Sequence, residues 1–401
     1  MRYLRAYQCI AALVRQNDST QTLTNRNSMR KDVMKQRQLW MTIGVVLLTI
    51  GFSSAQRYTT IDAPGAGTGA GQGTFPQNIT DSGLVFGYYV DSNGVAHGFL
   101  RSREGNYTKF DVSGAGTGAG QGTFPYSINP AVTITGQYID SSNVIHGFIR
   151  RADGDFTTFD APGAGNGAGE GTLSYNINPS GEVAGYYWDA ADVAHVFLRY
   201  RDGSFLTYEG PGAGTGAGQG TGTSAGIGLN PEGAVAGAII DDNNVLHGYF
   251  RKPDGTFVVI DAPGAGTGPG QGTDTDGVGA DYFVSGLEVD SNGVFHGWVR
   301  YANGMLTEFN VPGAGMGASQ GTLPEVFNSL DVVGGPYIDS NNVYHGFMRY
   351  PNGTIATFDA PGAGTGAGQG TFADCLNDEG VIGGMYFDAK GAVHGFLRTP
   401  W

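Results

Sequence analysis

From residue 56 onward, the chain is a succession of short apolar, β-branched or aromatic runs separated by turn residues. Four such runs follow one another near the start, at Phe75–Thr80, Leu84–Val90, Val95–Arg101 and Asn106–Asp111. The segments between them, such as Asp91-Ser92-Asn93-Gly94, have the composition of hairpin turns. Since no helical periodicity is found after residue 55, the pattern predicts an all-β chain of antiparallel strands.

Each group of four runs follows a glycine-rich stretch, and Asp62–Thr74, with the sequence DAPGAGTGAGQGT, is the first copy. Six further copies begin at Asp111, Asp160, Glu209, Asp261, Asn310 and Asp359. The starts are 49 residues apart, except for one step of 52 after Glu209. A four-stranded unit of about 40–50 residues, repeated without linkers, is typical of a propeller blade. We therefore predict a seven-bladed β-propeller with four antiparallel strands per blade.

The two ends of the repeat array complement each other. The last unit stops after its third run, within His394–Trp401, whereas Arg57–Asp62 is a fourth run with no unit before it. Pairing between the two ends would close a ring and remove the open edges that an unclosed array exposes. We predict that Tyr58–Asp62 pairs with Val393–Arg398 and completes the last blade.

The glycine stretch has glycine at every second position from Gly65 to Gly73. In an extended chain this alternation would leave one face without side chains. Ordering a glycine costs roughly 0.5–1 kcal/mol more than ordering an alanine. The stretches are therefore either held by many backbone hydrogen bonds or mobile, and the sequence leaves both alternatives open.

The first 55 residues lie outside the repeat. Residues 29–55 contain a short basic segment, the mainly apolar run Leu39–Phe52 and the small residues Ser53-Ser54-Ala55, which together predict a signal peptide cleaved after Ala55. The apolar run is shorter than the roughly 20 residues of a membrane span, so we expect a secreted chain, extracellular or periplasmic, without a span. Residues 1–28 precede a second plausible start at Met29 or Met34, and we interpret them as an upstream segment added by a start-site error.

Charge limits the classes of partner. Residues 1–55 hold 8 of the 22 Lys and Arg residues but 2 of the 36 Asp and Glu residues, so the remaining chain has a net charge of −20. Such a chain repels nucleic acid and anionic membrane, which favours neutral or cationic ligands.

After removal of Cys9, only Cys375 remains, so the fold is expected to be stable without an intramolecular disulfide. We expect a monomer.

All seven histidines occupy one position of the repeat, and each follows an aspartate by six residues. The pairs are Asp91 and His97, Asp140 and His146, Asp189 and His195, Asp241 and His247, Asp290 and His296, Asp339 and His345, and Asp388 and His394. In a four-stranded blade, this hairpin and the glycine stretch share one face, which is therefore expected to be acidic. These residues are the ligand-face candidates, because imidazole and carboxylate bind ligands and transfer protons.

We favour a structural role for these pairs, because a group repeated in every blade serves what every blade needs. The prediction is that the aspartate and the histidine of one hairpin are hydrogen-bonded within the blade. We assign no catalytic residue. Seven arginines, each four residues after a histidine, are interpreted in the same way, as cations stacked on neighbouring aromatic rings and paired with acidic turns such as those of Glu104 and Asp153.

Cofactor motifs are incomplete. The hairpin turn begins like an acidic calcium loop, but the later carboxylate of such a loop is missing. In the turn Asp388-Ala389-Lys390-Gly391, the alanine and lysine side chains cannot supply oxygen ligands. The glycine stretch lacks the GK[ST] ending of a phosphate loop and the helix that follows a dinucleotide loop. We expect no cofactor and no bound metal. A divalent cation is the one alternative, and the spacing of the ligands does not support it.

The unit containing Ile128-Asn129, Asp140, His146-Gly147-Phe148 and Phe156–Ala164 resembles the HAF family of probable extracellular repeat proteins. The resemblance extends over all seven units, although this chain has His-Gly-Phe where the family name records His-Ala-Phe. It implies export and repetition, and it implies no catalytic residues.

Two functions remain open. The first is a secreted binding or surface-interaction module for a carbohydrate, a protein or a cation. The alternative is a secreted propeller enzyme, a hydrolase or lyase, with its site at the mouth of the central channel. Since propellers serve both purposes, the discriminating feature is a pocket lined by residues present in only one or two units.

Overall fold

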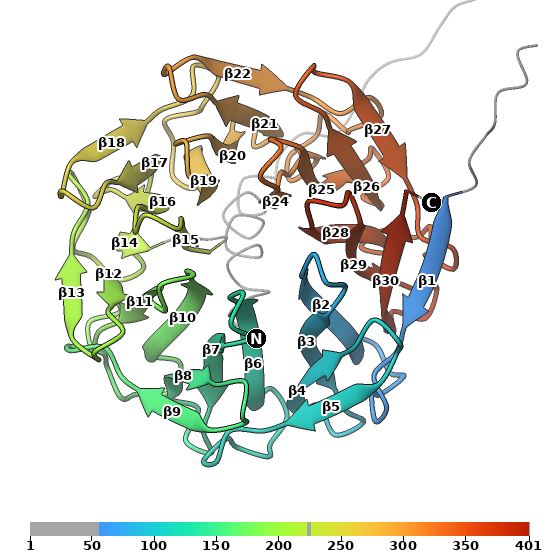
Figure 1. Cartoon of the computed structure of the whole chain (residues 1–401). Coiled ribbons are helices and arrows are strands. Elements are labelled where there is room, and N and C mark those ends of the chain that lie inside the picture. Colours follow the sequence, from blue (N-terminus) through green and yellow to red (C-terminus); the bar gives the residue numbers. More distant parts are fainter. Residues whose placement is uncertain (1–55, 223–225, 401) are drawn as a thin grey trace, which may run out of the picture.

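The computed structural model describes residues 56–222 and 226–400, and the regular secondary structure of these residues consists of β-strands. The strands form one closed ring of hydrogen-bonded elements (Figure 1). The all-β prediction is confirmed. The predictions for residues 1–28 and 29–55 fall outside the described residues. Within the described ranges, no helix is long and apolar enough to cross a membrane.

The strands follow the repeat, and we number the units 1 to 7 in chain order. Units 1 to 3 contain β2 (Gly73–Ile79), β3 (Val85–Val90), β4 (Ala96–Arg101), β5 (Tyr107–Phe110); β6 (Gly122–Ile128), β7 (Ile134–Ile139), β8 (Ile145–Arg150), β9 (Phe156–Phe159); and β10 (Gly171–Ile177), β11 (Val183–Trp188), β12 (Ala194–Arg199), β13 (Phe205–Tyr208). Units 4 and 5 contain β14 (Gly220–Gly222), β15 (Gly228–Leu229), β16 (Val235–Ile240), β17 (Leu246–Arg251), β18 (Phe257–Ile260); and β19 (Gly272–Val278), β20 (Val284–Val289), β21 (Phe295–Arg300), β22 (Leu306–Phe309). Units 6 and 7 contain β23 (Gly321–Thr322), β24 (Val326–Phe327), β25 (Val333–Ile338), β26 (Tyr344–Arg349), β27 (Ile355–Phe358); and β28 (Gly370–Leu376), β29 (Ile382–Phe387), β30 (Val393–Thr399), with β1 (Arg57–Ile61) beside β30.

Consecutive strands within a unit pair antiparallel, as in β2–β3, β3–β4 and β4–β5. The first strand of each unit lies nearest the centre of the ring and the fourth lies at its outer rim (Figure 1). The four strands expected in unit 1 are found within two residues of their predicted ends. In units 4 and 6 the first strand is divided into two short pieces. In unit 6 the backbone bonds from Leu323 N to Pro336 O and from Glu325 N to Gly334 O continue the pairing between the pieces.

The ends of the chain close the ring. Strand β1 pairs antiparallel with β30 in continuous register, from Arg57 opposite Thr399 to Ile61 opposite Gly395. The predicted closure is confirmed. Because β1 supplies the fourth strand of unit 7, the edge of β30 is not left exposed to solvent.

The glycine stretches are ordered by hydrogen bonds, which decides between the two alternatives. In the first stretch, Gly67 N donates to Val90 O at 2.8 Å, and Gly71 N donates to Gly391 O of the neighbouring unit at 2.9 Å. The carboxamide of Gln72 accepts from Gly69 N at 3.0 Å. The stretch is a series of turns wrapped around Gln72 rather than an extended segment, because these bonds fold it back on itself.

The last glycine of each stretch is fixed by a close approach between units. Gly73 has φ of +133°, and a Cβ atom there would overlap the carbonyl group of Val393 in unit 7. This contact belongs to a parallel bridge between Gly73 and Val393, and Gly122 makes the same bridge with Ala96. A glycine is therefore required where one unit docks on the next.

Apolar side chains fill the space between neighbouring units. One cluster joins Phe86 of unit 1 with Ile134 and Phe148 of unit 2, all fully buried. The arginines that stand four residues after each histidine extend these layers. The guanidinium of Arg150 lies 4.9 Å from the ring centroid of Phe110 in the preceding unit. Rings of the preceding unit are contacted in the same way by Arg199, Arg251, Arg300, Arg349 and Arg398. Arg101 lies over Tyr107 of its own unit, at 6.0 Å. The stacking predicted for these arginines is confirmed.

Candidate functional site

The histidines lie at the second residue of the third strand in each unit, and each contacts the acidic end of the fourth strand. Nδ1 of His97 is 3.0 Å from Oδ2 of Asp111, which directly follows β5. The same bond joins His146 to Asp160 (2.8 Å), His195 to Glu209 (2.5 Å), His247 to Asp261 (2.7 Å), His345 to Asp359 (2.8 Å) and His394 to Asp62 (2.9 Å). In unit 5 the partner is Asn310, at 2.8 Å from His296.

The predicted hydrogen bond between the histidine and the aspartate of its own hairpin is found in unit 3, where His195 Nε2 is 3.3 Å from Asp189 Oδ2. In the other six hairpins the prediction is wrong. There the corresponding distance is 3.6–3.8 Å, for Asp91, Asp140, Asp241, Asp290, Asp339 and Asp388. At 3.6 Å or more the two atoms are too far apart for a hydrogen bond, although each pair remains close enough for electrostatic attraction.

The turn aspartate is committed to the backbone instead. Oδ1 of Asp91 accepts from Asn93 N at 2.8 Å and from Val95 N at 2.9 Å. Burial raises the pKa of Asp91, but these two hydrogen bonds and the amide of Asn93 together hold it below its ordinary value. A carboxylate that bonds the turn N–H groups stabilises the hairpin, so the aspartate shapes the loop that carries the histidine.

A tyrosine completes the arrangement in five units. Tyr89, directly opposite His97 in the β3–β4 pairing, stacks on the imidazole with the ring centroids 5.0 Å apart. Tyr138, Tyr187, Tyr337 and Tyr386 stack on their histidines at 4.8–5.0 Å. Burial raises the pKa of Tyr89, with Asp111 and Asp91 acting in the same direction. We call the tyrosine, the histidine and the carboxylate the histidine site of a unit.

Sequence reasoning missed the tyrosine, although a signal was present. In these five units the tyrosine stands two residues before the turn aspartate, which is the position facing the histidine across a tight hairpin. The acidic residue that begins most of the glycine stretches is predicted on the same face as the histidine, but not as its hydrogen-bond partner.

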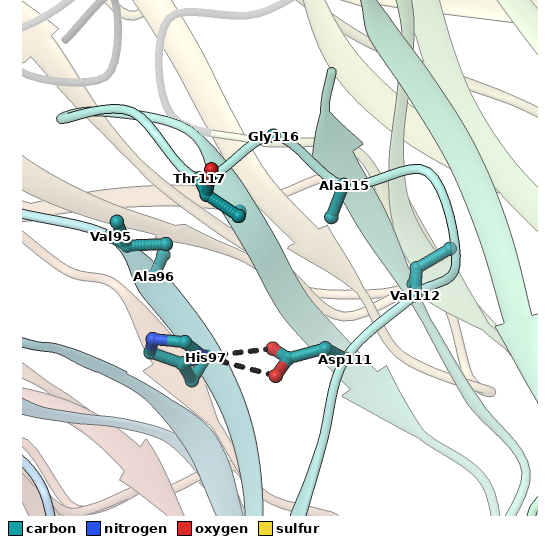
Figure 2. A pocket seen from close by; sticks show the side chains of 9 residues that line it. Val95, Ala96, His97, Asp111, Val112, Ala115, Gly116 and Thr117 are labelled. Carbon is teal, nitrogen blue, oxygen red and sulfur yellow. Dashed lines mark hydrogen bonds and ion pairs between the residues drawn. The ribbon is translucent and has the colours of Figure 1, made fainter. Parts of the chain in front are cut away.

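The site opens on a recess between neighbouring units. In unit 1 this recess has a volume of about 90 Å³, and its wall includes Ala96, His97, Asp111, Ala115 and Thr117 (Figure 2). The pair His97 and Asp111 lies on one side, and the glycine stretch that leads into unit 2 lies on the other (Figure 2). Gly120 N of this stretch donates to Gly94 O of the preceding hairpin, and Gly116 N donates to Ile139 O of the next unit. The predicted gathering of the hairpin and the glycine stretch on one face is therefore confirmed.

The polar groups of this face differ in accessibility. The carboxylates that follow the fourth strands are 46–60% exposed, whereas the histidine side chains are 15–32% exposed. A ligand on this face would meet the carboxylates first and the edge of each imidazole second. Within the described residues, no group of three or more His, Cys, Asp or Glu side chains is arranged to hold a metal ion.

Two units depart from the common site. In unit 4, Ile239 lies opposite His247, so no aromatic ring covers the imidazole. In unit 5, Glu288 lies opposite His296, and Asn310 replaces the carboxylate. The face is thus repeated but not uniform.

No family model and no curated protein matches the chain. Among solved structures, the chain is similar to the BP39L lectin from Burkholderia pseudomallei, with a TM-score of 0.53 and 10% identity, over 79% of this chain and 92% of the lectin. It is also similar to a puromycin hydrolase (TM-score 0.47, 13% identity, 80% of this chain), of which it spans half the length, 50%. A third is TolB from Acinetobacter baumannii (TM-score 0.41, 10% identity, 76% of each chain). At this identity the likeness to the lectin shows the fold alone, a β-propeller-like all-β repeat fold.

Proposed function

We propose that the protein is a secreted, seven-bladed β-propeller of the HAF type that binds carbohydrate through its repeated histidine sites. Each repeat unit would be one blade, with the divided first strands of units 4 and 6 counted as one strand each. Export would follow cleavage after Ala55, and the mature chain would act as a monomer.

The observation that carries the proposal is the recurrence of one partly exposed site. Tyrosine, histidine and carboxylate occur together in units 1, 2, 3, 6 and 7, beside the glycine stretch that leads to the next unit. An exposed carboxylate and an imidazole edge accept and donate hydrogen bonds, as the hydroxyl groups of a sugar require. The stacked tyrosine and the carboxylate hold the imidazole in one orientation, so the site is formed before a ligand arrives.

Repetition favours binding over catalysis. Several equivalent weak sites on one face raise the overall affinity for a polymer, because each further contact becomes intramolecular. Catalysis, in contrast, needs one site, and symmetry gives it no advantage. The fold is compatible with carbohydrate recognition, since the similar BP39L structure is a lectin. The net negative charge supports a neutral or cationic glycan over an anionic one.

The enzyme alternative rests on a different observation. Asp276 and Asp374 lie at bulges of β19 and β28, and Glu325 holds the same repeat position between β23 and β24. These first strands are the ones nearest the centre of the ring (Figure 1). Burial and the neighbouring Glu325 raise the pKa of both Asp276 and Asp374 well above the ordinary value of an aspartate. Perturbed carboxyl groups in only some units are a feature of catalytic sites. A hydrolase or lyase acting at the mouth of the channel is therefore the second candidate.

Glycan-array screening of residues 56–401, followed by calorimetry with the best neutral glycan, tests the first proposal. We expect several equivalent weak sites per chain, and the variant H97A should lose one of them while the others remain. If instead one glycan binds per chain and the variants D276N and D374N abolish this binding, the enzyme alternative is favoured. Mass spectrometry of exported protein tests secretion, with an amino terminus at Gln56 expected.

A further inference from the structure

The histidine site of unit 5 has a different chemistry from the other six. Glu288 on β20 takes the place of the tyrosine, and Asn310 takes the place of the carboxylate. A third change lies on β22, where Glu308 stands at the position that Lys109 occupies in unit 1. The remaining units have threonine or valine at this position, so unit 5 differs from all of them by two acidic groups near one imidazole.

Glu288 is a buried carboxyl group with too few donors. Its side chain is 1% exposed, and its Oε2 atom has no hydrogen-bond partner in the described structure. The backbone N–H of Gly264 lies against both glutamates: it donates to Glu308 Oε1 at 3.2 Å and also favours the ionised form of Glu288. The two carboxylates therefore share one N–H donor. Buried oxygen atoms are left without a hydrogen bond, which is unfavourable.

The charges around Glu288 come from three elements. Glu308 on β22 and Asp290 at the turn after β20 are both acidic, and His296 on β21 lies opposite Glu288. Nδ1 of His296 is 2.8 Å from Asn310 Oδ1, and its Nε2 is 3.6 Å from Asp290. Burial and then the Glu308 charge raise the pKa of Glu288 to about 7, although His296 and Gly264 act in the opposite direction. Near neutral pH, the cluster lacks a positive charge and a donor.

We propose that Glu288 and Glu308 of unit 5 bind a primary ammonium group, such as that of an amino sugar or an aliphatic amine. An ammonium group has three N–H donors and one positive charge, which satisfy Oε2 of Glu288 and offset the repulsion between the two glutamates. Glu308 is exposed and Glu288 is buried, so the ammonium group would reach the site from the side of Glu308.

A metal ion fits this cluster less well. Calcium needs six to eight oxygen ligands placed around one point. The described residues contain no group of three or more acidic, histidine or cysteine side chains with that arrangement. An ammonium group needs only about three acceptors and brings its own hydrogens, so it suits a site of two carboxylates that are not arranged for a metal.

The site occurs once in the described structure. Five other units have tyrosine at the position of Glu288, and unit 4 has Ile239. The expected stoichiometry is one ammonium group per chain, in contrast to the several sites proposed for neutral glycans.

Calorimetry with methylammonium chloride and with glucosamine tests the proposal, with sodium chloride at the same ionic strength and N-acetylglucosamine as references. We expect one site per chain for both amines, and E288Q and E308Q should each weaken it roughly tenfold or more. Because Glu288 must lose its proton to bind, the affinity should be roughly tenfold higher at pH 8 than at pH 6. The matched variant E379Q, which removes an exposed carboxylate at the turn between β28 and β29, should bind the amines like the wild type.

The outcomes separate clearly. Tighter binding of glucosamine than of methylammonium supports an amino sugar as the source of the group, and equal binding supports the ammonium group alone. An effect of sodium chloride equal to that of the amines, or unchanged amine binding by a folded E288Q, overturns the proposal. Because neutral glycans test the tyrosine-containing sites separately, failure of carbohydrate binding there is distinguishable from failure here.

Discussion

Nδ1 of His394 lies 2.9 Å from Oδ1 of Asp62, although 332 residues separate them in the sequence. This pair is the unit 7 copy of a bond that the other units make over 14 residues, as between His146 and Asp160. The amino-terminal strand thus completes both the sheet and the histidine site of the last unit. Ring closure and the candidate binding face depend on the same segment.

Removal of the closing strand tests this dependence. Deleting residues 56–62 exposes the edge of β30 and removes five residue pairs, so we expect a strong fall in melting temperature. The control D62A keeps the strand and removes only the imidazole partner, and it should change the melting temperature little. Calorimetric scanning measures both, and similar curves for the deletion and the wild type would contradict closure.

The two aspartates near each histidine should differ in their effect on stability. D91A leaves two turn N–H groups without their acceptor, at a cost of roughly 1–3 kcal/mol. D111N should cost well under that, since Asn310 already bonds His296 at 2.8 Å in unit 5. Urea unfolding of the two variants decides the roles. A larger loss for D111N would show that the pair of His97 and Asp111 is the main support of the hairpin.

Much of the fold follows from sequence because its causes are local and repeated. The turn residues between Leu84–Val90 and Val95–Arg101 define a hairpin without knowledge of the rest of the chain. The partner of His97 is harder to predict, since both Asp91 and Asp111 lie within reach: its Nε2 is 3.8 Å from Asp91, and its Nδ1 is 3.0 Å from Asp111. Side-chain orientation at the strand ends decides it, and periodicity carries no information on that orientation.

The special character of unit 5 was also beyond sequence reasoning. Glu288 and Glu308 are 20 residues apart, and each looks like an ordinary substitution at a variable position. They become one cluster only because β20 and β22 bring them to the same backbone group, that of Gly264. Burial, which makes the cluster chemically unusual, arises from packing between units.

The glycines of the connecting stretch should not be equivalent. G122A should be strongly destabilising, because a Cβ atom at this position, where φ is +118°, would overlap the carbonyl group of Ala96. G120S should be tolerated, since no atom lies within 4 Å of a Cβ there and Ser319 holds the equivalent position in unit 6 with φ of 63°. Chemical denaturation of both variants measures the difference, and equal losses would contradict the docking role of Gly122.

Glu288 should make stability depend on pH near neutrality. Its pKa is about 7 in the folded protein and close to 4.5 in the unfolded chain, so between these values the folded state binds more protons. The sign follows directly: the stabilising contribution is complete below about pH 4.5 and is lost as the pH rises through 7. Since one pKa unit corresponds to about 1.4 kcal/mol, the loss amounts to about 3 kcal/mol at most. E288Q removes the titrating group, so the difference in unfolding free energy between E288Q and the wild type should grow in favour of the variant from pH 5 to pH 8. Urea unfolding at both values checks this, with E308Q as the companion variant, which should lower the pKa of Glu288 and flatten the same dependence. A constant difference between E288Q and the wild type at the two pH values would show that Glu288 does not titrate in this range.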